Sequence, residues 1–173
     1  MFISPISNTA VLKQEWTQVK PVVTQHFGEN PQVYAQFNMK GHNGTDLRAK
    51  TGTPLFAPMD GIIKTKDSLS KGYGKHIFIR NPFKACEVVL AHLDKFNVTD
   101  GQRVSVGDLI GWSGNSGFST ASHLHWSFRL LKPGDWNKIY DWGVLDSNNG
   151  YFGWLDPLDF TLAWKGSLLK NNL

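Results

Sequence analysis

The middle of the chain is a succession of short apolar segments that follow one another too closely for helices to lie between them. The segments are rich in β-branched and aromatic residues and are bounded by Gly, Pro, Asn or Asp, a pattern typical of strands and turns. Short strands in close succession favour antiparallel architecture. We therefore predict a mainly β fold, with an antiparallel β-sheet or barrel-sandwich core and long loops. The predicted strands are residues 54–57, 61–65, 76–80, 86–90, 104–106, 109–112 and 124–130.

Short helices are predicted only near the N-terminus and the C-terminus. Apolar residues at helical spacing indicate one helix within residues 8–20. Asp156 can cap a second helix at residues 156–165, and Pro157 suits its first turn. Before it, residues 132–155 hold many Gly, Asn, Trp and Tyr residues and predict a long irregular loop. Loops of this length are uncommon in compact domains and often border functional sites.

Size and composition bound the class of protein. The 173 residues, 40% of them hydrophobic and 18% charged, suit one globular domain over residues 1–173, with its core motifs in residues 21–131. The formal net charge is +4, but the basic residues are scattered, so we expect no nucleic-acid partner. Cys86 is the only cysteine and lies in a predicted strand, so we expect no internal disulfide and interpret it as a small core residue.

The first candidate site residues are the two histidines of His123-Leu124-His125. On a strand, residues i and i+2 point to the same face, so both imidazoles would share a face with about 7 Å between their α-carbons. One could then bind a metal while the other reaches a group bound to that metal, and Leu124 would anchor the strand in the core. By itself the pattern is a weak signal.

His42, Asp46 and His92 complete the candidate set. On one extended strand His42 and Asp46 would lie about 13 Å apart, too far to share an ion at about 2 Å. A turn or bulge at Asn43-Gly44 would bring them together; otherwise the segment is a surface turn with a polar pair. Two histidines and one carboxylate form a usual catalytic zinc set that leaves a position for water. Spacing leaves several such triads possible.

The stretch from Gly41 to Trp126, about half of the chain, resembles the lysostaphin-type (LytM-like) zinc metallopeptidases, with the family motifs in their usual order. In chain order the matches are the His-x-Gly-x-Asp motif at 42–46, a strand-turn-strand at 52–61, a Gly-Tyr-Gly-Asn-like turn at 72–75, Ala-His-Leu at 91–93, a glycine-punctuated turn at 98–111 and the run into the closing His-x-His at 111–125.

This resemblance implies the roles of the five residues. It implies one zinc ion per chain bound by His42, Asp46 and His125, with His92 and His123 acting in catalysis. The implied activity is that of a zinc endopeptidase that hydrolyses peptide cross-links of bacterial peptidoglycan. The lack of a signal peptide and of a recognisable wall-binding domain fits a phage endolysin or virion-associated enzyme. We expect neutral imidazoles and an ionised carboxylate at such a site.

The chain also departs from the family pattern. Lys75 stands where Asn is usual, and Ser122 where Pro is common before His-Leu-His. Tyr34 is only a rough counterpart of the family's substrate-facing tyrosine. We expect the substrate groove to be lined by residues 29–41, 66–75, 81–87 and part of 132–155.

The sequence also predicts where the protein is made and where it acts. Residues 1–7 lack the basic region and apolar run of a signal peptide, and no stretch approaches the roughly 18 apolar residues of a membrane helix. We therefore expect a monomer without a transmembrane segment, made in the host cytoplasm and acting on the wall or periplasm after release or delivery.

Two alternatives are weighed against the enzyme. One is an inactive wall-binding or regulatory member of the same family, although such members lack ligands and here all five positions are filled. The other is a biotinyl or lipoyl carrier domain, which residues 57–63 and 98–110 resemble, although the hairpin between them has no Met-Lys-Met-type tip.

Overall fold

The computed structural model of the chain describes residues 4–6 and 21–160, and within them it confirms a mainly β, antiparallel fold. Helical turns are short: α1 (Pro31–Tyr34) and the 3-10 helices η1 (Ala35–Phe37), η2 (Trp136–Asp141) and η3 (Pro157–Phe160). The strands are β1 (Val23–Gln25), β2 (Thr45–Arg48), β3 (Pro54–Phe56), β4 (Gly61–Asp67), β5 (Lys75–Asn81), β6 (Cys86–Ala91), β7 (Leu93–Phe96), β8 (Arg103–Val104), β9 (Leu109–Ser113), β10 (His123–Leu130) and β11 (Trp154–Leu155).

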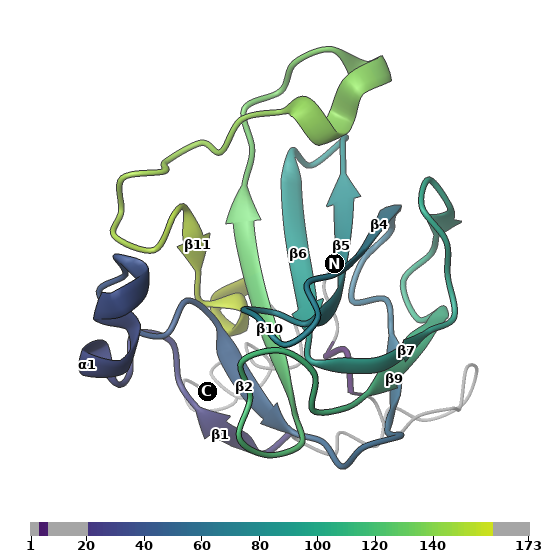
Figure 1. Cartoon of the computed structure of the whole chain (residues 1–173). Helices are drawn as coiled ribbons and strands as arrows, with labels where there is room; N and C mark the ends of the chain where they lie inside the picture. The colour runs from purple at the N-terminus through teal and green to yellow at the C-terminus, as the bar shows by residue number, and fades with distance from the viewer. Residues whose placement is uncertain (1–3, 7–20, 161–173) are drawn as a thin grey trace, which may run out of the picture.

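The strands form two antiparallel sheets. The larger has the order β1-β2-β10-β6-β5-β4-β8, with β11 added to β10, and the smaller has the order β3-β9-β7. Figure 1 shows the long strands β10, β6 and β5 side by side, with β7 and β9 crossing near one end of them.

The main core lies between the two sheets. Because strand side chains alternate, Leu124, Trp126 and Phe128 of β10 all join this core, together with residues of the smaller sheet such as Leu55 and Ile110. The burial of Leu124 confirms its predicted role as an anchor. The histidines of β10 are therefore turned to the opposite face of the large sheet.

That opposite face also carries a buried ionic network. Glu87 of β6 accepts hydrogen bonds from Arg80 of β5 and Arg129 of β10, and Arg80 also donates to the carbonyl of Ile139 in η2. Buried charges require such pairing. The network ties the three central strands to the segment that follows β10.

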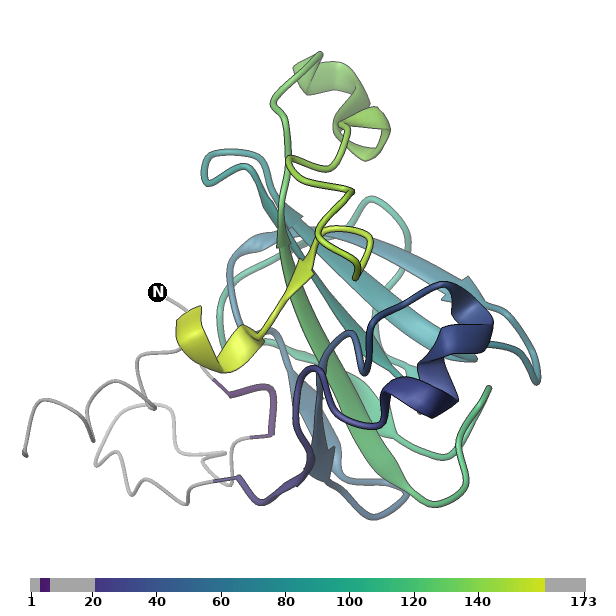
Figure 2. The same cartoon turned by 90° about the vertical axis from the view of Figure 1, so that its left-hand side faces the viewer.

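Residues 132–155 are more ordered than the predicted irregular loop. Leu131 pairs with Val144 in an isolated bridge, η2 contributes buried Ile139 to a small second core, and β11 adds to the edge of β10. Trp142 is also buried in this second core. In Figure 2 this segment rises beside β10 and descends toward α1.

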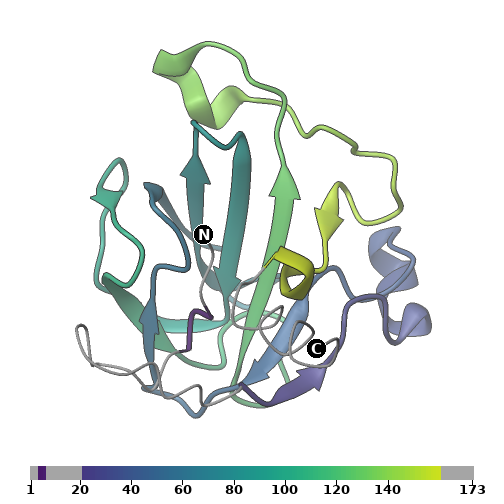
Figure 3. The ribbon, with the colours of Figure 1, turned by 180° about the vertical axis from the view of Figure 1, so that it is seen from behind.

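The helix predictions had mixed outcomes. The helix expected within residues 8–20 lies outside the described residues. At the other end, the structure has only the 3-10 helix η3, in which Asp156 Oδ1 accepts a hydrogen bond from the Leu158 amide, and residues 161–165 lie outside the description. Figure 3 shows η3 packed beside β10. The helical turns α1 and η1 were not predicted.

Cys86 is buried in the core, and burial raises the pKa of its thiol to about 11, so it is not a nucleophile at neutral pH. None of the described helices has the length and apolarity that a membrane crossing requires. The single domain predicted for residues 1–173 stays a prediction.

Candidate metal centre

Strand pairing brings the two ends of the predicted site together. In the β2–β10 pair, Asp46 lies opposite His125, and His123 lies opposite Arg48. Directly opposed residues on one face have their side chains in contact range. Asp46 Oδ1 is 3.1 Å from His125 Nδ1, and Asp46 Oδ2 is 3.4 Å from His123 Nε2. β2 itself was not among the predicted strands.

A bend before β2 places His42 beside Asp46 and His125, as the spacing of His42 and Asp46 required. Residues 41–44 are irregular, and the backbone of His42 is bonded instead to Gly28 and Glu29. Gly44 is needed in this bend because a Cβ there would lie 2.3 Å from Ser127 Oγ. The bend leaves His42 Nε2 only 3.2 Å from Asp46 Oδ1.

Three buried ligand atoms therefore converge. His42 Nε2 lies 2.9 Å from His125 Nδ1, and both nitrogens lie within 3.2 Å of the same carboxylate oxygen of Asp46. Ligands about 2.0–2.1 Å from a tetrahedral zinc ion lie about 3.3 Å from one another. The observed separations are close to that value, so the three residues fit a zinc ion.

The tautomers of the two histidines support the same conclusion. His42 Nδ1 lies 3.1 Å from the carbonyl oxygen of His26, to which it donates, so Nε2 keeps its lone pair. His125 Nε2 donates to Ser127 Oγ at 2.8 Å, because the Ser127 hydroxyl itself donates to the carbonyl of Asn43. Two imidazole lone pairs and a carboxylate then face one another, which favours a shared cation.

The protonation states suit a metal as well. Burial by itself would raise the pKa of Asp46, but its contacts with His125 and His42 outweigh burial and hold the pKa well below its ordinary value. Burial lowers the pKa of His125 to about 4 despite the contact with Asp46. An ionised carboxylate and a neutral imidazole are the forms that bind zinc.

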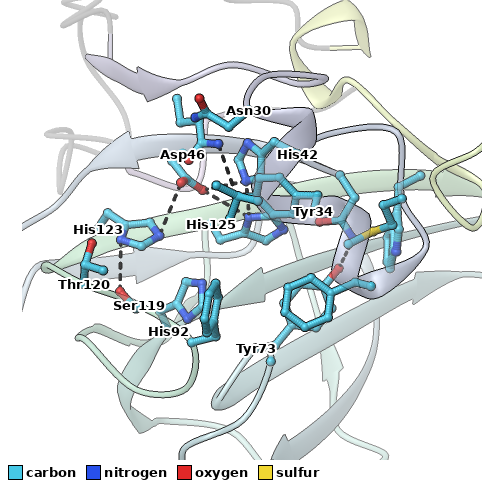
Figure 4. Close-up of a pocket in the computed structure, with 18 of the residues that line it drawn as sticks. Asn30, Tyr34, His42, Asp46, Tyr73, His92, Ser119, Thr120, His123 and His125 are labelled. Carbon is cyan, nitrogen blue, oxygen red and sulfur yellow. Dashed lines mark hydrogen bonds and ion pairs between the residues drawn. The ribbon is translucent and has the colours of Figure 1, made fainter.

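His92 and His123 lie beside this cluster without joining it. Their ring centroids are 4.7 Å apart, and His92 lies 5.9 Å from the His125 ring. His92 Nδ1 donates to the carbonyl of Ser116 and His123 Nδ1 to that of Ala121. Figure 4 shows both rings beside the metal-binding residues, in the pocket that they line. Burial, with the nearby His125 and His123, lowers the pKa of His92 to about 3.

Two tyrosines flank the metal ligands. The Tyr34 ring lies 5.2 Å from His42, and its hydroxyl accepts a hydrogen bond from Gln25. Burial and the charge of Asp46 raise the pKa of Tyr34 to about 12, so the hydroxyl keeps its proton. Tyr73 lies 5.1 Å from the His125 ring, and its hydroxyl accepts a 2.6 Å hydrogen bond from Asn43.

Sequence reasoning did not assign Ser127, Asn43 or Tyr73 to the site. Ser127 follows His125 by two positions on the same strand, so alternation was a signal that could have found it. Asn43 was treated only as part of a bend, and Tyr73 only as part of a turn motif. The hydrogen bond between Asn43 and Tyr73 could not be predicted from spacing, because it joins residues 30 positions apart in the chain.

These residues open into a cavity of about 480 Å³. The expected groove is partly wrong: segments 29–41, 66–75 and 132–155 contribute, but no residue of 81–87 lines it, and residues 118–120 do. The β5–β6 turn lies at the far end of the strands, since Cys86 pairs with Leu130 whereas Ala91 pairs with His125. His26 and His76 do not line this cavity either.

An antiparallel β fold that carries a buried cluster of two histidines and one aspartate, with two more histidines beside it, defines a metallopeptidase-type centre. The chain belongs to peptidase family M23, whose family model matches residues 40–137, more than half of the chain. M23 peptidases are zinc enzymes, and zinc is the metal that this cluster fits.

Two curated proteins with sequences similar to this chain support the family assignment. The chain is 41% identical over 88 residues to the glycyl-glycine endopeptidase ALE-1 of Staphylococcus capitis, covering 51% of this chain and 24% of that protein. It is 38% identical over 90 residues to the peptidoglycan DD-endopeptidase ShyC of Vibrio cholerae, covering 52% and 20%. The chain thus spans about a quarter or less of the length of these curated relatives.

A solved structure is similar over a larger share. The catalytic domain of lysostaphin from Staphylococcus simulans superposes with a TM-score of 0.55 and 30% sequence identity, covering 70% of this chain and 79% of that chain. The resemblance to lysostaphin-type peptidases and the predicted fold class are therefore confirmed.

Proposed function

We propose that this chain is a zinc-dependent endopeptidase that hydrolyses peptide cross-links of bacterial peptidoglycan. The observation that carries the proposal is the convergence of His42 Nε2, Asp46 Oδ1 and His125 Nδ1 in a pocket that His92 and His123 also line. Relatives named as peptidoglycan endopeptidases support the choice of substrate.

The residues divide into two working groups. Zinc bound by His42, Asp46 and His125 would supply a Lewis acid for the scissile carbonyl and would lower the pKa of water at the site. His92 and His123 both line the pocket, and the Nδ1 atom of each lies against a backbone carbonyl, so Nε2 is the atom through which either ring would accept the proton of the attacking water. The protonated ring can then donate to the leaving amine.

Tyr34 contributes a third function in this proposal. Its hydroxyl stays protonated, lies on the pocket wall beside His42 and is free to donate a hydrogen bond. A fixed donor at this position would stabilise negative charge that develops on the carbonyl oxygen. Removal of the hydroxyl should therefore slow hydrolysis more than it weakens zinc binding.

The test is digestion of purified peptidoglycan by the zinc-loaded protein, with mass spectrometry of the fragments. We expect new amino and carboxyl termini within the peptide bridges and intact glycan chains. Fragments cut only in the glycan, or no fragments from any wall, would contradict the proposal. The second outcome, with a full complement of zinc, would favour the inactive wall-binding alternative.

The biological setting is part of the proposal as well. A phage endolysin or virion-associated enzyme would reach the wall or periplasm after release or delivery, and its lytic activity would need no partner beyond the peptidoglycan peptide. Detection of the protein in purified virions or in the lysate at the time of lysis tests this role. Light scattering of the purified protein tests the expected monomer.

A further inference from the structure

The metal pocket has an apolar wall beyond the metal-binding residues. Phe37 of η1 and Phe118 of the β9–β10 loop line it, and their ring centroids lie 5.5 Å apart in an edge-to-face arrangement. Although aromatic, the two side chains are 37% and 52% exposed. Val33 and Phe152, also exposed, extend the same wall. Exposed apolar side chains that gather around a concave site mark a ligand surface.

The backbone holds Phe118 in place. The Phe118 amide donates to the carbonyl of Gly72 at 2.7 Å. Gly117 packs so closely on the turn before β5 that a Cβ on Gly117 would lie 2.3 Å from the amide nitrogen of Gly74. The loop is therefore clamped to this turn, and the ring is presented to the pocket at little ordering cost on binding.

The wall adjoins the reacting groups. Ser119 and Thr120, which follow Phe118, line the same pocket, and Ser119 Oγ lies 3.3 Å from His123 Nδ1. On the other side, Phe37 follows Tyr34 by one turn of the helical segment. The aromatic pair and the histidines therefore line one pocket, so a single bound peptide can contact both.

We propose that Phe37 and Phe118 determine substrate specificity by binding an alanine-type methyl side chain next to the scissile bond in preference to glycine. A methyl group placed against the two rings removes apolar surface from water, whereas glycine offers the wall no side chain. This inference rests on the proposed peptidase function and narrows its substrate class. The relatives leave the choice open, because they include a glycyl-glycine endopeptidase and a DD-endopeptidase.

Binding is measured first, with the metal-free protein, so that hydrolysis does not interfere. Fluorescence anisotropy compares labelled pentaglycine with peptides in which one glycine is replaced by L- or D-alanine. We expect the best alanine peptide to bind roughly tenfold more tightly than pentaglycine, and a Phe37→Ala/Phe118→Ala double variant to lose this preference. Equal or undetectable binding of all peptides to the wild type, or a preference that survives in the double variant, overturns the proposal.

Hydrolysis by the zinc-loaded protein provides the second readout. The ratio of kcat/KM for the alanine peptide and pentaglycine should fall toward one in the double variant, while Phe118→Leu retains most of the preference. Phe83→Ala is the matched control, because Phe83 is 84% exposed, contacts Trp136 and lies outside the pocket lining. It should leave the ratio unchanged.

Failure of the peptidase function and failure of the alanine preference give different results. If the zinc-loaded wild type cuts neither peptides nor peptidoglycan, the proposed function fails and the specificity proposal fails with it. If it cuts pentaglycine as fast as the alanine peptide, the peptidase function stands and only the role of the aromatic wall is overturned.

Discussion

Asp46 and His125 face each other across the β2–β10 pair, with Oδ1 of one 3.1 Å from Nδ1 of the other. They are 79 positions apart in the chain. Strand register, not sequence spacing, makes them neighbours, and a slip of one residue would turn Asp46 to the opposite face of the sheet. The metal site therefore depends on the integrity of this strand pair.

Replacement of Ser127 by alanine should weaken zinc binding without unfolding the protein. The Ser127 hydroxyl accepts from His125 Nε2 and so fixes the tautomer that leaves Nδ1 for the metal. Loss of such a supporting contact typically costs about 10–100-fold in metal affinity. Competition with a fluorescent zinc chelator measures the effect, with exposed Ser105→Ala as the control. Equal affinities in the two variants would show that the tautomer is set elsewhere.

Replacement of His123 by alanine should abolish cleavage while most of the zinc stays bound. His123 contacts Asp46 Oδ2 but is not one of the three converging ligands. Loss of a general acid–base group lowers the rate by about 10²–10⁴-fold. Peptide cleavage and metal analysis are measured on the same sample. His26→Ala is the control, since only the His26 carbonyl contacts His42. Loss of zinc in the His123 variant would contradict the assigned role.

Replacement of Gly44 by alanine should destabilise the fold and disturb the site together. The new Cβ would lie 2.3 Å from Ser127 Oγ and 2.6 Å from His125 Cε1. Overpacking of this kind costs about 1–3 kcal/mol in free energy of unfolding. Gly143→Ala is the matched control, because nothing lies within 4 Å of its Cβ position. Urea denaturation of the metal-free variants gives the difference, and similar unfolding curves would argue against a tightly packed bend.

Acid should destabilise the metal-free protein partly through His76. Burial, and to a lesser degree Lys66, lowers the pKa of this histidine from its ordinary value of 6.5. The unfolded chain then binds the proton more readily, so this contribution to stability is complete above pH 6.5 and is lost as the pH falls toward the folded-state pKa.

The measurement is urea unfolding at pH 7.5 and pH 5.5 in wild type and His76→Gln. The variant should lose less free energy of unfolding between these two pH values than the wild type. His26→Gln, at an exposed position, should behave like the wild type. An identical pH dependence in His76→Gln and wild type would show that His76 does not contribute to the destabilisation by acid.

The sequence predicted the strands better than it predicted the contacts between them. Runs of β-branched and aromatic residues between turn residues are a local signal, so they indicated the long strands of the core. The alternation of side chains along a strand then predicted the burial of Leu124. The short strand β2 carries polar residues and was missed, because its burial comes from its neighbours β1 and β10. The turn α1 was missed because only four residues form it and none of them is buried.

The candidate site was predictable only in part for a related reason. Spacing showed that His42 and Asp46 need a bend to share an ion, and the bend is present at Gly44. Spacing did not choose among the possible triads, whereas the order of motifs did. Contacts such as that of Asn43 with Tyr73 depend on tertiary packing and carry no local signal.

Metal analysis of Asp46→Ala beside the wild type tests most directly whether His42, Asp46 and His125 bind the zinc ion. Asp46 Oδ1 contacts both ligand nitrogens, so its removal leaves two imidazoles without the carboxylate that completes the set. After dialysis, inductively coupled plasma mass spectrometry should find one zinc per wild-type chain and almost none in the variant. Circular dichroism verifies that the variant is folded. A wild type without zinc, or a variant that retains one zinc per chain, would contradict the assignment of this site.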